Sequence, residues 1–180
     1  MLCNDQKSVA MIFNPKNRNR IVNTTFPNFT LGSSVLQFVS EFKYLGHIIT
    51  NDLCDNNDIQ REIRNMFVRT NTLVRRFSKC SLEVKIVLFR SYCISLYNAA
   101  LWKMYNKGSI RKLLSCYNKC LKIFFNYRRC DSLTQILLHL GLPSFDTIIV
   151  NSSVVFARCY ANCSNSIIQY LRVLGYWWSC

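Results

Sequence analysis

The sequence predicts an α+β fold, a small antiparallel β corner followed by a mainly α-helical bundle. Short apolar stretches separated by Pro, Gly and Asn fill residues 8–50, as is typical of short strands and turns. From residue 55 the apolar residues recur every three or four positions, which is the period of a helix. Half of the 180 residues are apolar, which is enough for a buried core. We therefore expect a β segment at residues 1–52, a basic helical bundle at 53–130, and a helical extension with an aromatic tail at 131–180.

Three stretches make up the expected β corner. Residues 8–14 (SVAMIFN) have the composition of a short buried strand, and residues 30–39 that of two short strands around a Gly-Ser turn. Residues 41–50 (EFKYLGHIIT) follow as one more strand. So few short strands are only marginally stable by themselves, so we expect them to be one corner of a larger sheet.

Five helices are expected beyond the β corner. The second is apolar nearly all round, so we expect it to be central in the bundle. Asn56 or Asn57 can cap the first helix, while Ser132 and Gln135 form a capping box for the fourth, which Gly141 ends. The expected ranges are about 55–77, 81–105, 109–127, 132–141 and 145–163.

The cysteines and the apolar stretches exclude several classes of protein. The ten cysteines include no C-x-x-C pair, and His47 and His139 lie far apart, so we expect reduced, mostly buried thiols, no metal site and no bound cofactor. The N-terminal residues lack the apolar core of a secretory signal, which favours an intracellular protein, cytoplasmic or nuclear. Residues 86–102 are mostly apolar, but Arg90 and Asn98 interrupt them, so we expect a buried helix and no integral membrane span.

Positive charge is concentrated in the first three helices. The net charge is +14, and 16 of the 23 Lys and Arg residues lie between Ile59 and Arg129, where Glu62 and Glu83 are the only acids. A phosphate backbone would neutralise such a surface, so the balance favours a nucleic-acid partner contacted without base-specific readout. The alternative is a solvated face with cations that favour helix C-termini. The candidate contact residues are Arg75, Arg76, Lys79, Lys85, Arg111, Lys112, Lys119 and Lys122.

An ordered set of motifs resembles the reverse transcriptases of non-LTR (LINE-type) retrotransposons. Residues 4–8 (NDQKS) and 11–13 (MIF) resemble the late palm motif of that family, and residues 42–46 (FKYLG) resemble its primer grip. The segments that follow resemble the thumb, and the whole resemblance extends over about residues 4–140. The thumb-like segments are DNNDIQREIR (55–64), LFRSYC (88–93), LW (101–102) and YNK (117–119).

The resemblance implies roles for particular residues. Residues 1–52 would be the palm edge with the primer-grip strand, and residues 53–130 the thumb. Lys43, Tyr44 and Gly46 would face the primer strand, where a glycine allows close backbone approach. Lys7 matches a palm lysine proposed to act as a general acid.

The aspartates that bind Mg²⁺ in the intact parent enzyme have no match in this sequence, nor do the fingers and most of the palm. We therefore expect a truncated, catalytically inactive part of an RNA-directed DNA polymerase. It would retain backbone contacts to RNA or an RNA–DNA hybrid, and the missing palm and fingers would be its natural neighbours.

Two alternatives remain open from the sequence. The chain can be a nucleic-acid-binding module with a host role, which the sequence does not distinguish from the polymerase fragment. It can also be a basic helical protein that binds an anionic membrane surface or a partner, through its cationic face and the Trp-rich end at residues 176–178.

Overall fold

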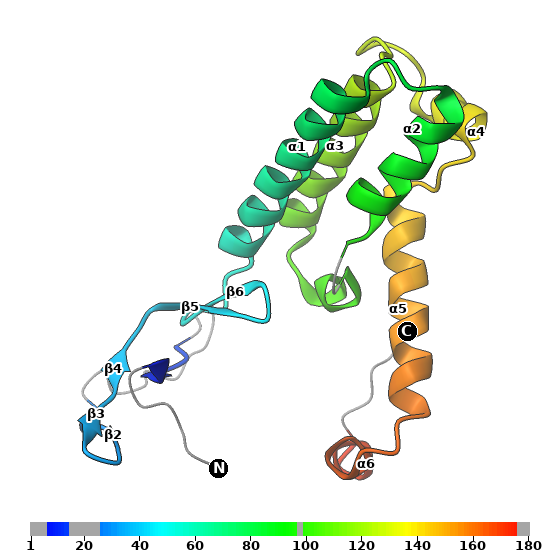
Figure 1. The fold of residues 1–180 in the computed structure, drawn as a ribbon. Coiled ribbons are helices and arrows are strands. Elements are labelled where there is room, and N and C mark those ends of the chain that lie inside the picture. The colour runs from blue at the N-terminus through cyan, green and yellow to red at the C-terminus, as the bar shows by residue number, and fades with distance from the viewer. Residues whose placement is uncertain (1–6, 15–25, 97–98, 176–180) are drawn as a thin grey trace. The chain divides into compact units, whose positions relative to one another are not determined.

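The computed structural model describes residues 7–14, 26–96 and 99–175, and its contacts divide the chain into two compact units, residues 1–61 and 62–180 (Figure 1). The α+β class is confirmed, because the short strands lie in the first unit and nearly all helical residues in the second. The strands are β1 (Val9–Ala10), β2 (Thr30–Leu31), β3 (Ser34–Val35), β4 (Gln37–Phe38), β5 (Glu41–Tyr44) and β6 (His47–Thr50). The helices are α1 (Asn56–Phe77), α2 (Leu82–Phe89), α3 (Lys107–Phe124), α4 (Leu133–Leu140), α5 (Phe145–Ala161) and α6 (Ser166–Val173).

The strands of the first unit form three separate two-stranded pairs. β1 pairs with β4 in parallel, whereas β2–β3 and β5–β6 are antiparallel. The expected turn between residues 30 and 39 is confirmed, with Gly32 at a φ of 63° between β2 and β3. The expected strand at 8–14 is only partly right, because ladder bonds form at Val9 and Ala10 alone.

Residues 41–50 form a hairpin, so the prediction of one continuous strand is wrong. β5 and β6 are joined by Leu45 and Gly46, which have φ values of 48° and 89°. A two-residue turn with both φ values positive matches the right-handed twist of the flanking strands, and glycine adopts this conformation without strain. The register pairs Tyr44 with His47 and Phe42 with Ile49, so each face carries even-numbered residues on one side of the turn and odd-numbered residues on the other. The pattern alone resembled one strand because the adjacent apolar residues Ile48 and Ile49 fit either register.

A buried carboxylate fixes this hairpin to the start of α1. The side chain of Asp58 is only 1% exposed and accepts hydrogen bonds from the His47 ring at 2.9 Å, the Ile48 amide at 3.0 Å and the Arg61 guanidinium at 2.9 Å. Burial by itself would raise the pKa of Asp58, but these three partners outweigh it and hold the pKa below the usual 3.8. Asp58 therefore does more than oppose the helix dipole, the role its place in the first turn suggested.

In the second unit, α1 and α3 lie side by side and run in the same direction (Figure 1). The Cys116 thiol of α3 lies 3.8 Å from the Ile63 carbonyl of α1. One turn further along α3, the Cys120 side chain hydrogen-bonds the side chain of Thr70 on α1. Aromatic rings from α2, from α3 with its C-cap and from α5 pack together, and they form the core of the unit. These rings belong to Phe89, Tyr117, Phe124, Phe125 and Phe145.

The single long helix expected at 81–105 is wrong. α2 ends at Phe89, a π-helical turn covers Arg90–Ile94, and a 3₁₀ segment begins at residue 99. The Ser95 hydroxyl donates to the Ser91 carbonyl at 2.6 Å, and such back-bonding competes with helix continuation. The break lets Trp102 become fully buried, in the segment that packs against α5. α2 is not central either, since Val87 is 61% exposed.

The C-terminal helices agree with the pattern except at their ends. α4 ends at Gly141, which has a φ of 59° as a C-terminal glycine should, although the Ser132 side chain does not make the expected capping bond. α5 is confirmed, capped by Ser144. α6 was not expected; the Asn165 side chain caps it. The aromatic residues 176–178 lie outside the described residues.

The described cysteines are all free thiols, as expected, but the expectation that most are buried is wrong for these residues, since only Cys93, Cys116 and Cys120 are buried. Burial raises the pKa of the Cys93 thiol to about 11. In the described part of the chain no single helix is both long and apolar enough to cross a membrane, though α4 and α5 pass that test together as a pair bent by 58°.

Candidate nucleic-acid interface

The predicted cations of α3 share one exposed face of the helix. Arg111, Lys112 and Lys119 are exposed, and at 3.6 residues per turn their positions fall within an arc of about 100°. The opposite face is buried, which fixes the orientation of the cationic face toward solvent. Its buried side chains are Leu113, Cys116, Tyr117, Cys120, Leu121 and Phe124.

The N-terminal end of α3 is positive for two reasons. Lys107 stands in its first turn, which contains no acid, and Arg111 and Lys112 follow one turn later. The amides at a helix N-terminus carry a positive partial charge, which disfavours cations and attracts anions. The Asn106 side chain accepts a hydrogen bond from one of these amides, that of Gly108, at 2.7 Å. The charge-count argument did not single out Lys107, although its place directly after a capping Asn is visible in the sequence.

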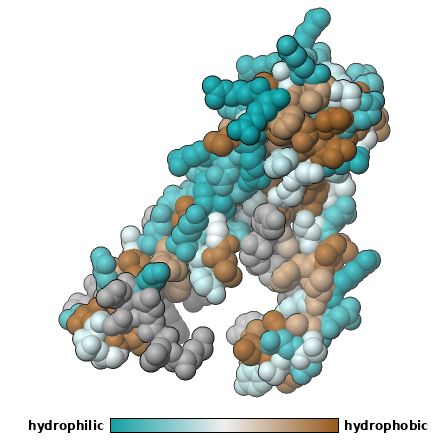
Figure 2. All heavy atoms as spheres, viewed as in Figure 1, coloured by the Kyte–Doolittle hydropathy of each residue, from teal (hydrophilic) through white to brown (hydrophobic). Residues whose placement is uncertain are grey.

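The cations expected at the junction of the first two helices lie at the end of α1. Arg75 and Arg76 occupy the last turn and are exposed, as is Lys79 beyond it, while Lys85 on α2 is half-buried. Figure 2 shows hydrophilic residues gathered along α1 and over this end of the helical unit. Cations at a helix C-terminus are favoured by the dipole even without a partner, so this group is the weaker indication of an anionic ligand.

Several other cations are engaged within the protein. The Lys122 ammonium donates to the carbonyls of Arg129 at 2.8 Å and Asp131 at 2.7 Å, so it closes the loop after α3. Lys122 therefore differs from the other α3 candidates, because a phosphate would have to displace these bonds. On α1, Arg61 and Arg69 pair with acids, the former with Asp58 and the latter with Glu62.

The remaining cations of α1 and α3 have no acidic partner in the described part of the chain. Within the described residues, no carboxylate lies in ion-pair distance of the three exposed α3 candidates or of Arg75 and Arg76. Arg64 belongs to the same class, being exposed on the α1 stripe that leads to Arg75. It was not among the candidates predicted from the sequence, and the nearby Glu62 binds Arg69.

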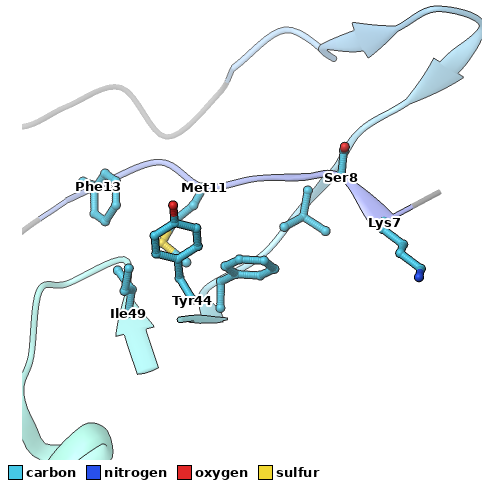
Figure 3. Close-up of a pocket in the computed structure, with 8 residues that line it drawn as sticks. Lys7, Ser8, Met11, Phe13, Tyr44 and Ile49 are labelled. Carbon is cyan, nitrogen blue, oxygen red and sulfur yellow. The ribbon is translucent and has the colours of Figure 1, made fainter. Parts of the chain in front are cut away.

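In the first unit, the structure brings residues of the N-terminal segment 7–13 together with residues of the β5–β6 hairpin, while residues 4–6 of the first motif lie outside the described residues. Tyr44 and Phe42 from β5 line an open groove of about 420 Å³ with Met11 and Phe13 from the N-terminal segment (Figure 3). Lys7 lies at one end of this groove, and its side chain extends away from the aromatic residues (Figure 3).

At the tip of the hairpin, Lys43, Tyr44 and Gly46 are all exposed. A Cβ added at Gly46 would have no described atom within 4 Å. The backbone at this turn is therefore open to a ligand. Exposed aromatic rings with a nearby cation are the chemistry that stacks a base and holds its phosphate.

Among the residues that the structure describes, no group of three or more His, Cys, Asp or Glu side chains is arranged to hold a metal ion. Comparisons with protein-family models, with curated proteins and with solved structures find no match to this chain.

Proposed function

We propose that the chain binds RNA or an RNA–DNA hybrid through the phosphate backbone. In this proposal it acts as the primer-grip and thumb-like part of an RNA-directed DNA polymerase of the non-LTR type. The observation that carries it is the cationic face of α3, defined by Lys107, Arg111, Lys112 and Lys119. Support for the polymerase context comes from the ordered motifs of the sequence, among them FKYLG at 42–46, which forms a hairpin tip with an exposed backbone.

The α3 face is poorly explained as a solvated surface. Cations at the C-terminal end of α1 gain from the dipole, but those at the N-terminal end of α3 lose, by about 0.3–1 kcal/mol for a charge in the first turn. A phosphate placed there would be favoured by the helix amides and the side chains together. The face spans about 18 Å from Lys107 to Lys119 at 1.5 Å per residue, which is enough to meet several phosphates of one duplex.

A second candidate function, attachment to an anionic membrane surface, is favoured by α6. Its outer side exposes Ile167, Tyr170 and Val173, the last of these 83% exposed. An apolar helix side next to a basic protein body is typical of peripheral membrane binding. The same surface also suits a protein partner.

A salt series separates these functions. The measurement is fluorescence anisotropy with a labelled RNA–DNA hybrid, an RNA duplex and a DNA duplex of equal length. The logarithm of the binding constant should fall linearly with the logarithm of the salt concentration. Flotation with phosphatidylserine vesicles is the parallel measurement. Binding to vesicles, with no binding to any of the three duplexes at 50 mM salt, would refute the nucleic-acid proposal.

A further inference from the structure

A second cavity lies beside the cationic helices, between the loop after α3 and the outer side of α4. It has a volume of about 400 Å³, at the small end of the range for ligand pockets. Its lining residues are Tyr127, Asp131, Ser132, Gln135, Ile136 and His139. It thus combines two aromatic rings, one buried apolar side chain and three groups that form hydrogen bonds.

The loop that forms one wall is tied at several points. Asp131 accepts a hydrogen bond from the Arg128 amide at 2.7 Å, and its own amide donates back to the Arg128 carbonyl at 3.2 Å. Lys122 holds the carbonyls of Arg129 and Asp131, and the Tyr127 amide donates to the Lys122 carbonyl at 2.9 Å. The wall is therefore pre-organised, which reduces the entropy lost when a ligand binds.

Charge decides what this pocket accepts. None of its lining residues is Lys or Arg, and one is the carboxylate of Asp131, so a phosphate is disfavoured inside. Arg128 and Arg129 are exposed immediately beside it in the loop. A nucleotide would therefore enter base first, with its phosphates directed to the arginines and its base near Tyr127 and His139, as single-stranded nucleic acids bind aromatic side chains.

The hydrogen-bonding groups select among the bases. One oxygen of Asp131 accepts from the Arg128 amide, and the other has, among the residues that the structure describes, only the weak thiol donor of Cys130, 4.0 Å away. A carboxylate only accepts hydrogen bonds, and guanine presents adjacent ring N–H and amino donors on its Watson–Crick edge. We propose that the pocket at the α3–α4 junction binds an unpaired guanine base of a strand held by the cationic helices, an inference that rests on the proposed function.

The test uses labelled 12-mer oligouridylates with a central G, A, C or U, and anisotropy at 0.1 M salt with the full chain. We expect the G oligonucleotide to bind at least fivefold more tightly than the others. Asp131→Asn should reduce this preference below twofold while leaving affinity for the all-U strand unchanged, because the Asn oxygen still accepts from Arg128. Arg111→Gln/Lys112→Gln is the matched control, which should weaken all four oligonucleotides equally and preserve the preference.

A second readout covers a folding defect in the first variant. A fluorescent guanine analogue at the central position should be quenched on binding to the wild type, and His139→Ala, at an exposed position, should reduce that quenching by at least half. Equal affinity for all four oligonucleotides, or quenching unaffected by His139→Ala, would overturn the guanine pocket and leave phosphate binding intact. No binding to any oligonucleotide or duplex would overturn both proposals.

Discussion

Removing the charge of the α3 face should abolish most of the salt-sensitive affinity for nucleic acid. The variant replaces Arg111, Lys112 and Lys119 by Gln, which removes the charge and keeps a similar helix propensity. All three are exposed and lack an acidic partner among the described residues, so the fold should lose little. We expect the free energy of unfolding to change by less than about 0.5 kcal/mol per site.

The expected loss in affinity follows from counterion release. Each phosphate contact to a duplex contributes about 0.9 to the slope of log affinity against log salt. At 0.1 M salt this amounts to roughly eightfold, or about 1.2 kcal/mol, for each contact. Three contacts give a loss of about 500-fold and a slope smaller by about 2.7.

The assay is anisotropy with a labelled RNA–DNA hybrid between 50 and 400 mM salt. Arg158→Gln is the control, since it removes an exposed charge from α5, away from the α3 face, and should change affinity less than twofold. Urea unfolding of each variant verifies the fold. If the triple variant keeps the slope of the wild type, or if Arg158→Gln weakens binding as much as a single α3 substitution, specific phosphate contact by this face is refuted.

Three further outcomes are expected from the structure. Lys122→Ala should destabilise the protein by about 1–2 kcal/mol in urea unfolding, because two carbonyls lose a charged donor. Lys119→Ala is the control and should destabilise it by less than about 0.5 kcal/mol. Equal destabilisation by the two variants would contradict the structural role of Lys122. The pKa of Asp58 is depressed in the folded state, so the stability that this carboxylate contributes is complete above its usual pKa of 3.8 and is lost as the pH falls further. The free energy of unfolding between pH 5 and 3 should therefore decline less steeply in Asp58→Asn than in the wild type. Iodoacetamide should label the exposed Cys130 within minutes and leave the buried Cys93 unmodified in the native state, as peptide mass spectrometry would show, and rapid labelling of Cys93 would indicate that the core opens.

Much of the helical unit was predictable because its signals are local. The apolar period of α1 and α5 follows from which side chains face the core, and the end of α4 from a glycine that takes a positive φ. The concentration of positive charge between residues 59 and 129 is likewise a property of the sequence itself. Three of the four cations on the α3 face, Arg111, Lys112 and Lys119, could be predicted from helical spacing alone.

The errors occurred where partners distant in sequence decide the outcome. α2 stops at Phe89, and directly after it the Arg90 guanidinium reaches the Gly141 carbonyl, 51 residues away, at 2.7 Å. An apolar run indicates burial but not continuity of the helix, so the π-helical turn and the 3₁₀ segment could not be read from it. The hairpin at Leu45–Gly46 was missed for another reason, since the adjacent apolar residues Ile48 and Ile49 fit the alternation of one strand as well as the shifted alternation that the hairpin produces.

The sequence by itself determined the α+β class, the positions of most helices and the excess of positive charge, because composition and periodicity act over a few residues. Only the tertiary structure decided which cations are available to a ligand. Arg61, Arg69 and Lys122 bind carboxylates or carbonyls of the protein, while Arg111 and Lys119 have no such partner in residues 7–14, 26–96 and 99–175. The physical reason is that a charge is satisfied by whatever group folding places within about 4 Å, and that distance is set by three-dimensional packing and not by the order of residues along the chain.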